Sequence, residues 1–209
     1  MRVLITAGPT REYLDDVRYL SNASSGRMGF ALAEAVMAAG HEVVLALGPV
    51  SLTPPVGCEV HDVETTDELL AACNHLFPQC DGVIATAAVC DYRPKARFPG
   101  KLAKTGVSLE LELVETADVL ADLGRHKGDR WIIGFALESD EFAHVNVLRK
   151  LKEKNCDAIV LNRPTAIGSR DNRIEIIDTE GATVVTFAGS KRNVAQQLWE
   201  WIEQSVVRA

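Results

Sequence analysis

The chain has 209 residues, 47% of them hydrophobic and 24% charged, which is typical of a globular protein with one large core. Its formal net charge of −7 argues against broad binding to nucleic acid or to a membrane, since both favour a basic face. The sequence contains no apolar run of 18 residues, and strand-like sequence from Val3 onwards predicts no signal peptide. Its five cysteines form no Cys-x-x-Cys pair. We therefore expect a single domain over residues 1–209 in the cytoplasm.

Short apolar runs rich in β-branched residues predict the strands of a sheet. The predicted strands are 3–7, 43–47, 58–63, 82–89, 109–113, 131–136 and 157–161, followed by 173–178 and 182–187 around a hairpin turn at Glu180–Gly181. The run 82–89 is the most apolar and fits a central strand that is buried on both faces.

Runs with helical periodicity alternate with these strands along the chain. The predicted helices are 30–39, 66–77, one capped by Thr116 and ending near 125, 140–154, and a last one capped by Ser190 and ending at 207. This alternation predicts an α/β fold, a three-layer Rossmann-like sandwich with a mainly parallel sheet and a C-terminal antiparallel hairpin.

Two loops concentrate the polar residues that could carry chemistry. The segment 8–26 is too long for an ordinary connection, and it ends in Ser24, Ser25 and Gly26 just before a predicted helix. We expect the serines to cap that helix and its N-terminus to favour an anion, phosphate above all. The second loop, 91–104, follows the central strand and is basic, and ligands of open α/β sheets bind at such strand ends.

A set of short motifs occurs in one order along nearly the whole chain. They are residues 8–12 (GPTRE), 16–18 (DVR), 21–22 (SN), 24–26 (SSG), 87–93 (AAVCDYR), 101–104 (KLAK), 134–138 (GFALE) and 150–157 (KLKEKNCD). With this ordered set the sequence resembles phosphopantothenoylcysteine synthetase, an enzyme of coenzyme A biosynthesis. The family joins 4′-phosphopantothenate to L-cysteine, and its bacterial members use CTP and pass through an acyl-cytidylate.

The resemblance implies a role for each matching residue. Lys101 aligns with a loop lysine needed to form the acyl-nucleotide, and Asn22 with an asparagine needed to convert this intermediate into product. Arg18 would help to hold a substrate phosphate together with Ser24, Ser25 and Gly26. The positions that match nucleotide contacts are Ala85, Thr86, Ala87, Ala88, Asp91, Lys101, Ala117, Asp118, Val119, Leu120, Phe135, Lys150 and Lys154.

The resemblance also implies partners and cofactors. It predicts Mg²⁺ bound with CTP, with ATP as the other possible nucleotide, and it names no protein ligand of the metal. It predicts a homodimer with a substrate site near the subunit boundary. We expect no flavin domain in this chain and a separate decarboxylase for the next step. The sequence departs from the family pattern at three places that bear on nucleotide affinity and base preference. They are Arg27, Ala103 and Thr116–Asp118.

Each of these residues also has a plainer interpretation. Asn22 alone would be a turn residue, Arg18 a surface ion pair, Lys101 a solvated loop charge, and Phe135 a core residue. Cys90 has no histidine near it in sequence, so we interpret it as structural. The alternative functions are a Rossmann-like NAD(P)-dependent reductase or epimerase, which the missing Gly-x-Gly-x-x-Gly motif disfavours, and a non-catalytic scaffold.

Overall fold

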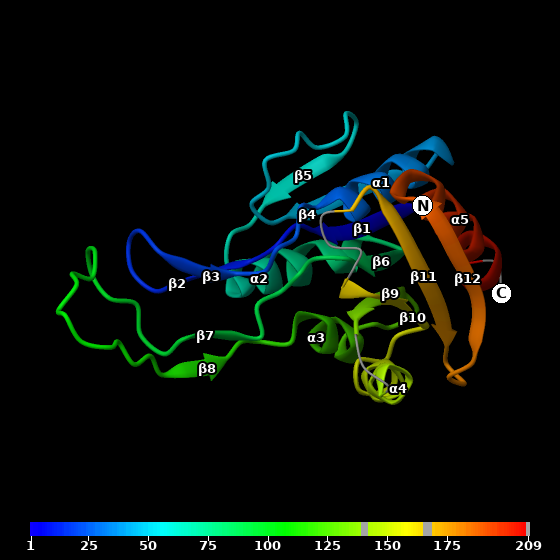
Figure 1. The fold of residues 1–209 in the computed structure, drawn as a ribbon. Coiled ribbons are helices and arrows are strands. Elements are labelled where there is room, and N and C mark those ends of the chain that lie inside the picture. Colours follow the sequence, from blue (N-terminus) through cyan, green and yellow to red (C-terminus); the bar gives the residue numbers. More distant parts are fainter. Residues whose placement is uncertain (139–141, 165–168, 208–209) are drawn as a thin grey trace.

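A computed structural model of the chain describes residues 1–138, 142–164 and 169–207. Its centre is an eight-stranded sheet (Figure 1). In spatial order the strands are β12 (Thr183–Ser190), β11 (Asp171–Asp178), β10 (Ala158–Asn162), β9 (Trp131–Leu137), β6 (Gly82–Ala85), β1 (Arg2–Ala7), β4 (Glu42–Leu47) and β5 (Glu59–Asp62). The strands from β10 to β5 pair in parallel, and β11 and β12 extend one edge as an antiparallel hairpin.

Helices cover both faces of the sheet, which confirms the predicted three-layer α/β sandwich. One face carries α1 (Arg27–Ala38) and α5 (Lys191–Ile202). The other face carries α2 (Thr66–Leu76), α3 (Val119–Arg125) and α4 (Ala143–Glu153). Among the described residues, no helix combines the length and the apolar character needed to cross a bilayer.

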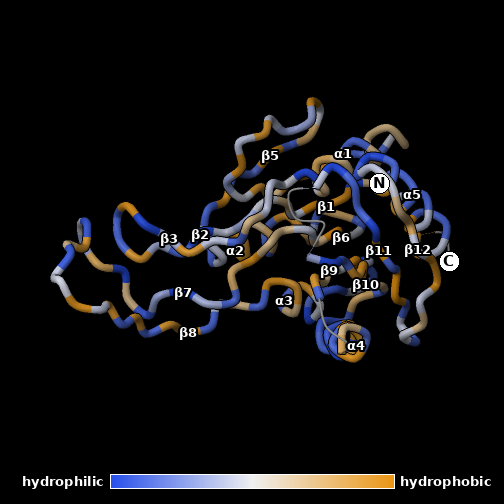
Figure 2. The backbone as a smooth tube through the Cα atoms, viewed as in Figure 1, coloured by the Kyte–Doolittle hydropathy of each residue, from blue (hydrophilic) through white to orange (hydrophobic). Residues whose placement is uncertain are grey.

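The central strands supply both hydrophobic cores, because successive side chains of a strand point to opposite faces. Ile5 of β1 and Ile84 of β6 join the core beneath α1 and α5, whereas Leu4 and Val83 join the core beneath α2, α3 and α4. All four are fully buried, and each contributes about 1.5–3 kcal/mol to folding. Figure 2 shows the hydrophobic segments gathered around β1, β6 and β10.

The central strand predicted over 82–89 is shorter in the structure and ends at Ala85. The Thr6 side chain explains this end: its Oγ1 accepts a hydrogen bond from Ala87 N (3.2 Å), while Thr86 Oγ1 donates to Thr6 O (2.6 Å). These side-chain contacts interrupt the regular ladder after the backbone bond from Thr86 N to Thr6 O (3.1 Å). Beyond them the segment pairs with the chain after β1 only through an isolated parallel bridge between Ala88 and Pro9.

Two short antiparallel strand pairs project from this end of the sheet. They are β2 (Arg11–Tyr13) with β3 (Tyr19–Ser21), and β7 (Tyr92–Pro94) with β8 (Leu113–Glu115). We call residues 11–21 and 92–115 the arm. Figure 1 shows the arm extending away from the sheet, with β2 beside β7.

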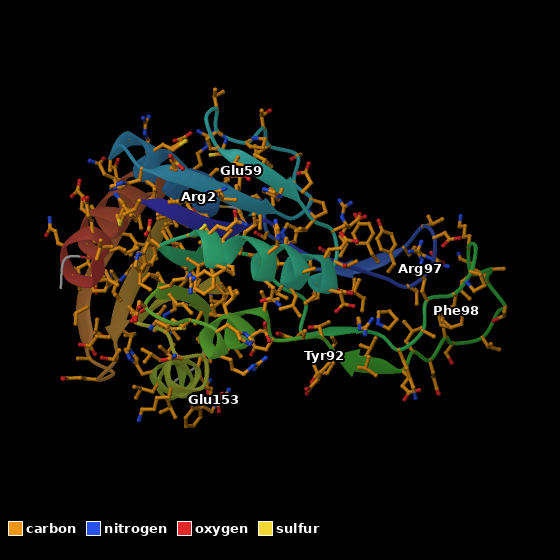
Figure 3. All side chains as sticks on the ribbon, turned by 180° about the vertical axis from the view of Figure 1, so that it is seen from behind. Arg2, Glu59, Tyr92, Arg97, Phe98 and Glu153 are labelled. Atoms are coloured by element: carbon orange, nitrogen blue, oxygen red, sulfur yellow. The ribbon has the colours of Figure 1, made fainter. Side chains whose placement is uncertain are left out.

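The sequence did not predict the arm correctly. The long segment 8–26 contains the unexpected pair β2–β3, and the strand predicted over 109–113 is wrong except at Leu113. The alternation of apolar and polar residues over 109–113 does not reflect a buried strand face, since Leu109 is 56% exposed. Figure 3 shows Arg97 and Phe98 far out on the arm and Tyr92 nearer to the sheet.

Several helix ends also differ from their predictions. Helix α1 begins at Arg27, earlier than residue 30, and α3 is capped by Asp118 rather than Thr116, because the Asp118 carboxylate accepts from Ala121 N (3.0 Å). The predicted start of a helix at 140 lies outside the described residues. Ser190 caps α5 as predicted, and a π-helical turn, Glu203–Val207, follows that helix.

Candidate active site

A cavity of about 800 Å³ opens at the carboxyl ends of β6 and β9. Its walls come from the start of α1, the segment after β6, the start of α3 and one side of α4. The predicted site residues line it, with the exception of Arg18 and Lys101. Those lining the cavity are Asn22, Ser24, Ser25, Gly26, Ala85, Thr86, Ala87, Ala88, Asp91, Ala117, Asp118, Val119, Leu120, Phe135, Lys150 and Lys154.

The start of α1 forms one end of this cavity. Gly26 is the N-cap residue and has a left-handed backbone (φ 73°), and no side chain caps the helix. The expectation that Ser24 and Ser25 cap α1 is therefore wrong. Ser24 Oγ instead accepts a long bond from Gly26 N (3.4 Å). The first N–H groups of a helix have no partner within the helix, so this end remains suited to an anion.

Glycine allows α1 to lie directly on the sheet beside the cavity. A Cβ atom at Gly29 would lie 2.5 Å from the Cβ of Ala7 and 2.8 Å from Oγ1 of Thr86. A Cβ at Gly8 would lie 2.7 Å from the carbonyl oxygen of Gly48. The approach at Gly29 places the start of α1 against β1 and the segment after β6, and the approach at Gly8 places the end of β1 against the turn after β4. The floor beneath the cavity is therefore closely packed.

Asn22 joins the base of the arm to the segment that follows β6. Its Nδ2 donates to the carbonyl oxygens of Ala88 (3.1 Å) and Val89 (2.8 Å). These two bonds hold the side chain at the edge of the cavity. To donate to a substrate carbonyl, as the resemblance implies, the amide would have to exchange one of these backbone acceptors for the substrate.

Cys90 lies under this junction and supports it. Its backbone N donates to Thr10 Oγ1 (2.9 Å), its Sγ donates to Thr10 O (3.5 Å), and its carbonyl accepts from Thr116 Oγ1 (2.5 Å). Burial raises the pKa of the Cys90 thiol, which disfavours the nucleophilic thiolate. These contacts fit the structural interpretation of Cys90.

The wall formed by α3 and α4 carries cations that are each paired with a carboxylate. Lys150 Nζ lies 2.6 Å from Glu138 Oε1, and Lys154 Nζ lies 3.0 Å from Asp118 Oδ2. Lys150 and Lys154 sit four residues apart near the C-terminus of α4 and share one helix face, as predicted. Their ammonium groups thus enter the cavity from one side with their charge already balanced.

Arg18 belongs to the arm and is bound to Asp15, whose side chain is fully buried. The guanidinium of Arg18 donates through Nε (2.9 Å) and Nη2 to Asp15 Oδ2, and Nη2 also donates to Leu102 O (2.9 Å). Hydrogen bonds from Arg18 lower the pKa of Asp15 well below its usual range, although burial opposes that shift. The structure thus gives Arg18 a structural ion pair in the arm, outside the cavity lining.

Lys101 is exposed and directly precedes Leu102, which contacts both Arg18 and Asp15. Both of its neighbours are fixed by consecutive carboxylates: Gly100 N donates to Asp16 Oδ2 (2.8 Å) and Leu102 N donates to Asp15 Oδ2 (3.1 Å). Asp16 N also donates back to Gly100 O (3.0 Å). Two residues that the resemblance assigns to the reaction, 83 positions apart in sequence, therefore lie together on the arm.

Several lining residues were missed by sequence reasoning. They come from elements that local patterns do not bring to the cavity, namely the end of β10, the exposed side of α4 and the start of α5. Asn162 follows a predicted strand, so its position at a strand end was the available signal. The missed residues include Arg149, Glu153, Asn162 and Lys191.

The described part of the chain offers oxygen ligands for a divalent cation but no dedicated cage. Within the described residues, no three His, Cys, Asp or Glu side chains gather as a metal site. Mg²⁺ commonly shares one or two carboxylates with the phosphates of its substrate. Asp91 lines the cavity and fits that role.

Comparison with known proteins identifies the family. The family model described as DNA/pantothenate metabolism flavoprotein C-terminal domain matches residues 1–206. The coenzyme A biosynthesis bifunctional protein CoaBC of Bacillus subtilis (strain 168) is 40% identical over 193 residues, which cover 92% of this chain and 46% of that protein. The chain thus spans about half the length of the curated relatives it matches.

Solved structures share the fold. The crystal structure of the C-terminal domain of CoaBC matches with a TM-score of 0.83 and 36% identity, over 100% of this chain and 96% of that one. Cab2 H337A in complex with phosphopantothenate-cysteine matches with a TM-score of 0.76 and 17% identity, over 99% of this chain and 88% of that one, which shows the fold alone. The resemblance seen in the sequence motifs is confirmed, and the chain belongs to the family of the DNA/pantothenate metabolism flavoprotein C-terminal domain.

Proposed function

We propose that this domain is a phosphopantothenate–cysteine ligase that activates 4′-phosphopantothenate with CTP. The observation that carries the proposal is the cavity itself. Segments far apart in the sequence, represented by Asn22, Asp91, Phe135 and Lys150, line one space of about 800 Å³ in a chain whose family match spans residues 1–206. This volume is within the range of pockets that hold small-molecule substrates.

In the first half-reaction, a carboxylate oxygen of 4′-phosphopantothenate attacks the α-phosphorus of the nucleotide. The bond between the α-phosphorus and the bridging oxygen breaks, pyrophosphate leaves, and an acyl-cytidylate forms. Negative charge gathers on the phosphates during this step, so nearby cations accelerate it. We assign this task to Lys101, and Mg²⁺ held by the phosphates and Asp91 would neutralise further charge.

In the second half-reaction, the amine of L-cysteine attacks the acyl carbonyl. The carbon–oxygen bond to CMP breaks, the amine loses a proton, and an amide remains. Donors aimed at the carbonyl oxygen stabilise the negative charge that develops there. We assign this donation to Asn22, whose Nδ2 already lies at the cavity edge among backbone carbonyls. Arg18 would bind an anionic group of the substrate through guanidinium N–H groups other than those that hold Asp15.

Arg18 and Lys101 lie on the arm, so a second copy of the chain is the simplest way to bring them to a cavity. The arm exposes large apolar side chains, which favours burial against a partner. They are Val17, Tyr19, Leu20, Tyr92, Phe98, Val107, Leu109 and Leu113. We propose a homodimer in which the arm of one copy completes the cavity of the other.

The remaining expectations follow the same resemblance. We propose that the protein acts in the cytoplasm without flavin, nucleic acid or membrane, and that a separate decarboxylase takes its product. The five cysteines are free thiols, which suits a reducing compartment. ATP remains the other candidate nucleotide, because base choice depends on a few hydrogen bonds.

The proposal is tested by following both products of purified protein with 4′-phosphopantothenate and Mg²⁺, using CTP or ATP, with and without L-cysteine. We expect pyrophosphate release that requires 4′-phosphopantothenate, and an amide product that requires cysteine. Absence of pyrophosphate release with either nucleotide would contradict the proposal. Binding of NAD(P) in the same cavity would then favour the reductase alternative, and binding of neither cofactor nor nucleotide would favour the scaffold.

A further inference from the structure

Glu138 lies just after β9 and beside the cavity, in contact with α4. Its Oε1 accepts from Lys150 Nζ at 2.6 Å, and its Oε2 accepts from Asn146 Nδ2 at 3.3 Å. Asn146 and Lys150 are one helical turn apart, so both oxygens of the carboxylate are held by a single face of α4. Lys150 lines the cavity, whereas Glu138 does not.

The structure holds this carboxylate firmly. The side chain of Glu138 is 13% exposed, and its backbone N donates to Asn162 O (3.1 Å) across the ends of β9 and β10. A lysine side chain alone is long and flexible. Contact with a fixed carboxylate restricts the ammonium of Lys150 to one place at the cavity wall and leaves two of its three N–H donors for other acceptors.

We propose that Glu138 is a positioning residue that acts through Lys150 to present an N–H donor to an uncharged acceptor of the nucleotide, on its base or ribose. This inference rests on the proposed function, because it requires that the cavity bind a nucleotide. It makes Glu138 part of nucleotide selection although the side chain touches no ligand itself.

The charge balance of the wall explains why the acceptor is uncharged. A carboxylate 2.6 Å from the ammonium cancels much of its charge, and it would repel a phosphate placed against the same lysine. The same balance recurs at Lys154 with Asp118 and at Arg149 with Glu153. The opposite end of the cavity, at Gly26, has the N-terminus of α1, which favours anions. We thereby assign the phosphates to the wall at the start of α1 and the nucleoside to the wall formed by α4.

The test is a double-mutant cycle read by equilibrium binding. Calorimetry with Mg²⁺ would compare Glu138→Gln, Lys150→Met and the double variant, using CTP or ATP, whichever the wild-type protein binds more tightly, and tripolyphosphate as a ligand without base and ribose. We expect each single change to weaken nucleotide binding about tenfold, and the double change to weaken it no further. Tripolyphosphate binding should stay within twofold of wild type, which also reports that each variant has kept its folded cavity.

A matched control and a milder variant complete the design. Glu59→Gln breaks an ion pair of the same length, Arg2 of β1 with Glu59 of β5 at 2.6 Å, and should leave nucleotide binding unchanged because neither residue lines the cavity. Figure 3 shows Arg2 and Glu59 together, away from Glu153 of α4. Asn146→Ala removes only the hydrogen bond from Asn146 Nδ2 to Glu138 Oε2. It should therefore weaken nucleotide binding less than Glu138→Gln does, and it should have no effect in the Lys150→Met background.

Each outcome decides the inference. Additive losses in the double variant, or equal losses for nucleotide and tripolyphosphate, would overturn it while leaving the ligase proposal standing. Failure of the wild-type protein to bind either nucleotide would overturn both.

Discussion

The cavity and the arm are built by different means, and the contrast matches the division of chemistry that we propose for the two half-reactions. The cavity rests on the ends of buried parallel strands, where Gly29 brings α1 into direct contact with Ala7 and Thr86. The arm has two pairs of three-residue strands, exposed apolar side chains, and the buried carboxylate of Asp15 at its centre. A closely packed floor has little room to shift, whereas a projecting arm with exposed apolar side chains can meet a partner.

In the proposed function, this contrast separates the residues that receive substrates from those that bring charge to them. Asn22 and Asp91 line a preformed cavity, whereas Arg18 and Lys101 are carried outside it. Changes in the packed floor beneath the cavity should therefore alter stability. Changes in the arm should alter catalysis with little effect on nucleotide binding.

The largest expected effect comes from one substitution in each region. Asn22→Ala should leave pyrophosphate release nearly intact but lower amide formation about 10²–10³-fold, the scale of losing one donor to a developing oxyanion. Lys101→Gln should stop pyrophosphate release itself, because it removes a cation from the first step. Pyrophosphate release and amide formation, measured separately on each variant, check this division.

A control on the same arm sharpens that comparison. Lys95 is also a lysine of the arm and is paired with Glu112 at 2.7 Å. Lys95→Gln should leave both half-reactions close to wild type. Equal loss of both steps in the Asn22 and Lys101 variants would contradict the assignment of one residue to each step.

The next effect in size concerns the rigid floor of the cavity. Gly29→Ala places a Cβ atom 2.5 Å from the Cβ of Ala7, so α1 must shift, and we expect a loss of about 1–3 kcal/mol in the free energy of unfolding. Urea denaturation measures it. Glu34→Ala, an exposed change on the same helix, should stay within about 0.5 kcal/mol of wild type. Equal stability of the two variants would show that the floor is not tightly packed.

The buried carboxylate of Asp15 gives the arm a pH dependence. The pKa of Asp15 is depressed by Arg18, so its carboxylate stabilises the folded arm at pH above its ordinary value of about 4 and loses that contribution as the pH falls further. Hydrogen exchange of residues 99–103 should therefore accelerate several-fold below about pH 4, relative to residues of β1.

Asp15→Asn supplies the matching variant. It removes the charge but keeps the shape, so exchange in residues 99–103 should be fast at neutral pH and lose most of its acid dependence. Exchange that rises in acid to the same extent in this variant would assign the effect to another group.

The smallest expected effect tests the exposed apolar surface of the arm. Val107 is 78% exposed, so Val107→Ser should change the free energy of unfolding of an isolated copy by less than about 0.5 kcal/mol. Sedimentation at several concentrations measures whether the same change weakens self-association. A large loss of stability in dilute protein would mean that this side chain is buried within a single copy.

Sequence reasoning was most successful where the signal was local. An apolar run followed by polar residues placed Ala87, Ala88 and Asp91 at a strand end, and the structure puts them at the cavity. Helix starts were less certain, because Gly26 rather than a serine caps α1. Alternation alone misled at 109–113, where no partner face exists to bury the apolar side chains.

The structure of the arm could not be predicted from the sequence for a different reason. The contacts of Arg18 with Asp15 and with Leu102, 84 positions away, depend on two loops meeting in space. Lys191 reaches the cavity through α5, which follows the antiparallel hairpin, so no local pattern indicates its position. Both features follow from tertiary packing that composition and periodicity do not encode.

The most direct test of the account is to mix two inactive variants, Asn22→Ala and Lys101→Gln, and measure amide formation. If the arm of one copy serves the cavity of another, mixed dimers contain one cavity with an intact Asn22 and an intact Lys101 delivered to it. The account predicts recovery of up to about a quarter of wild-type activity, since half of the dimers would be mixed and each would hold one complete site. Mixing that restores no activity, although exchange of subunits is demonstrated, would contradict an active site shared between cavity and arm.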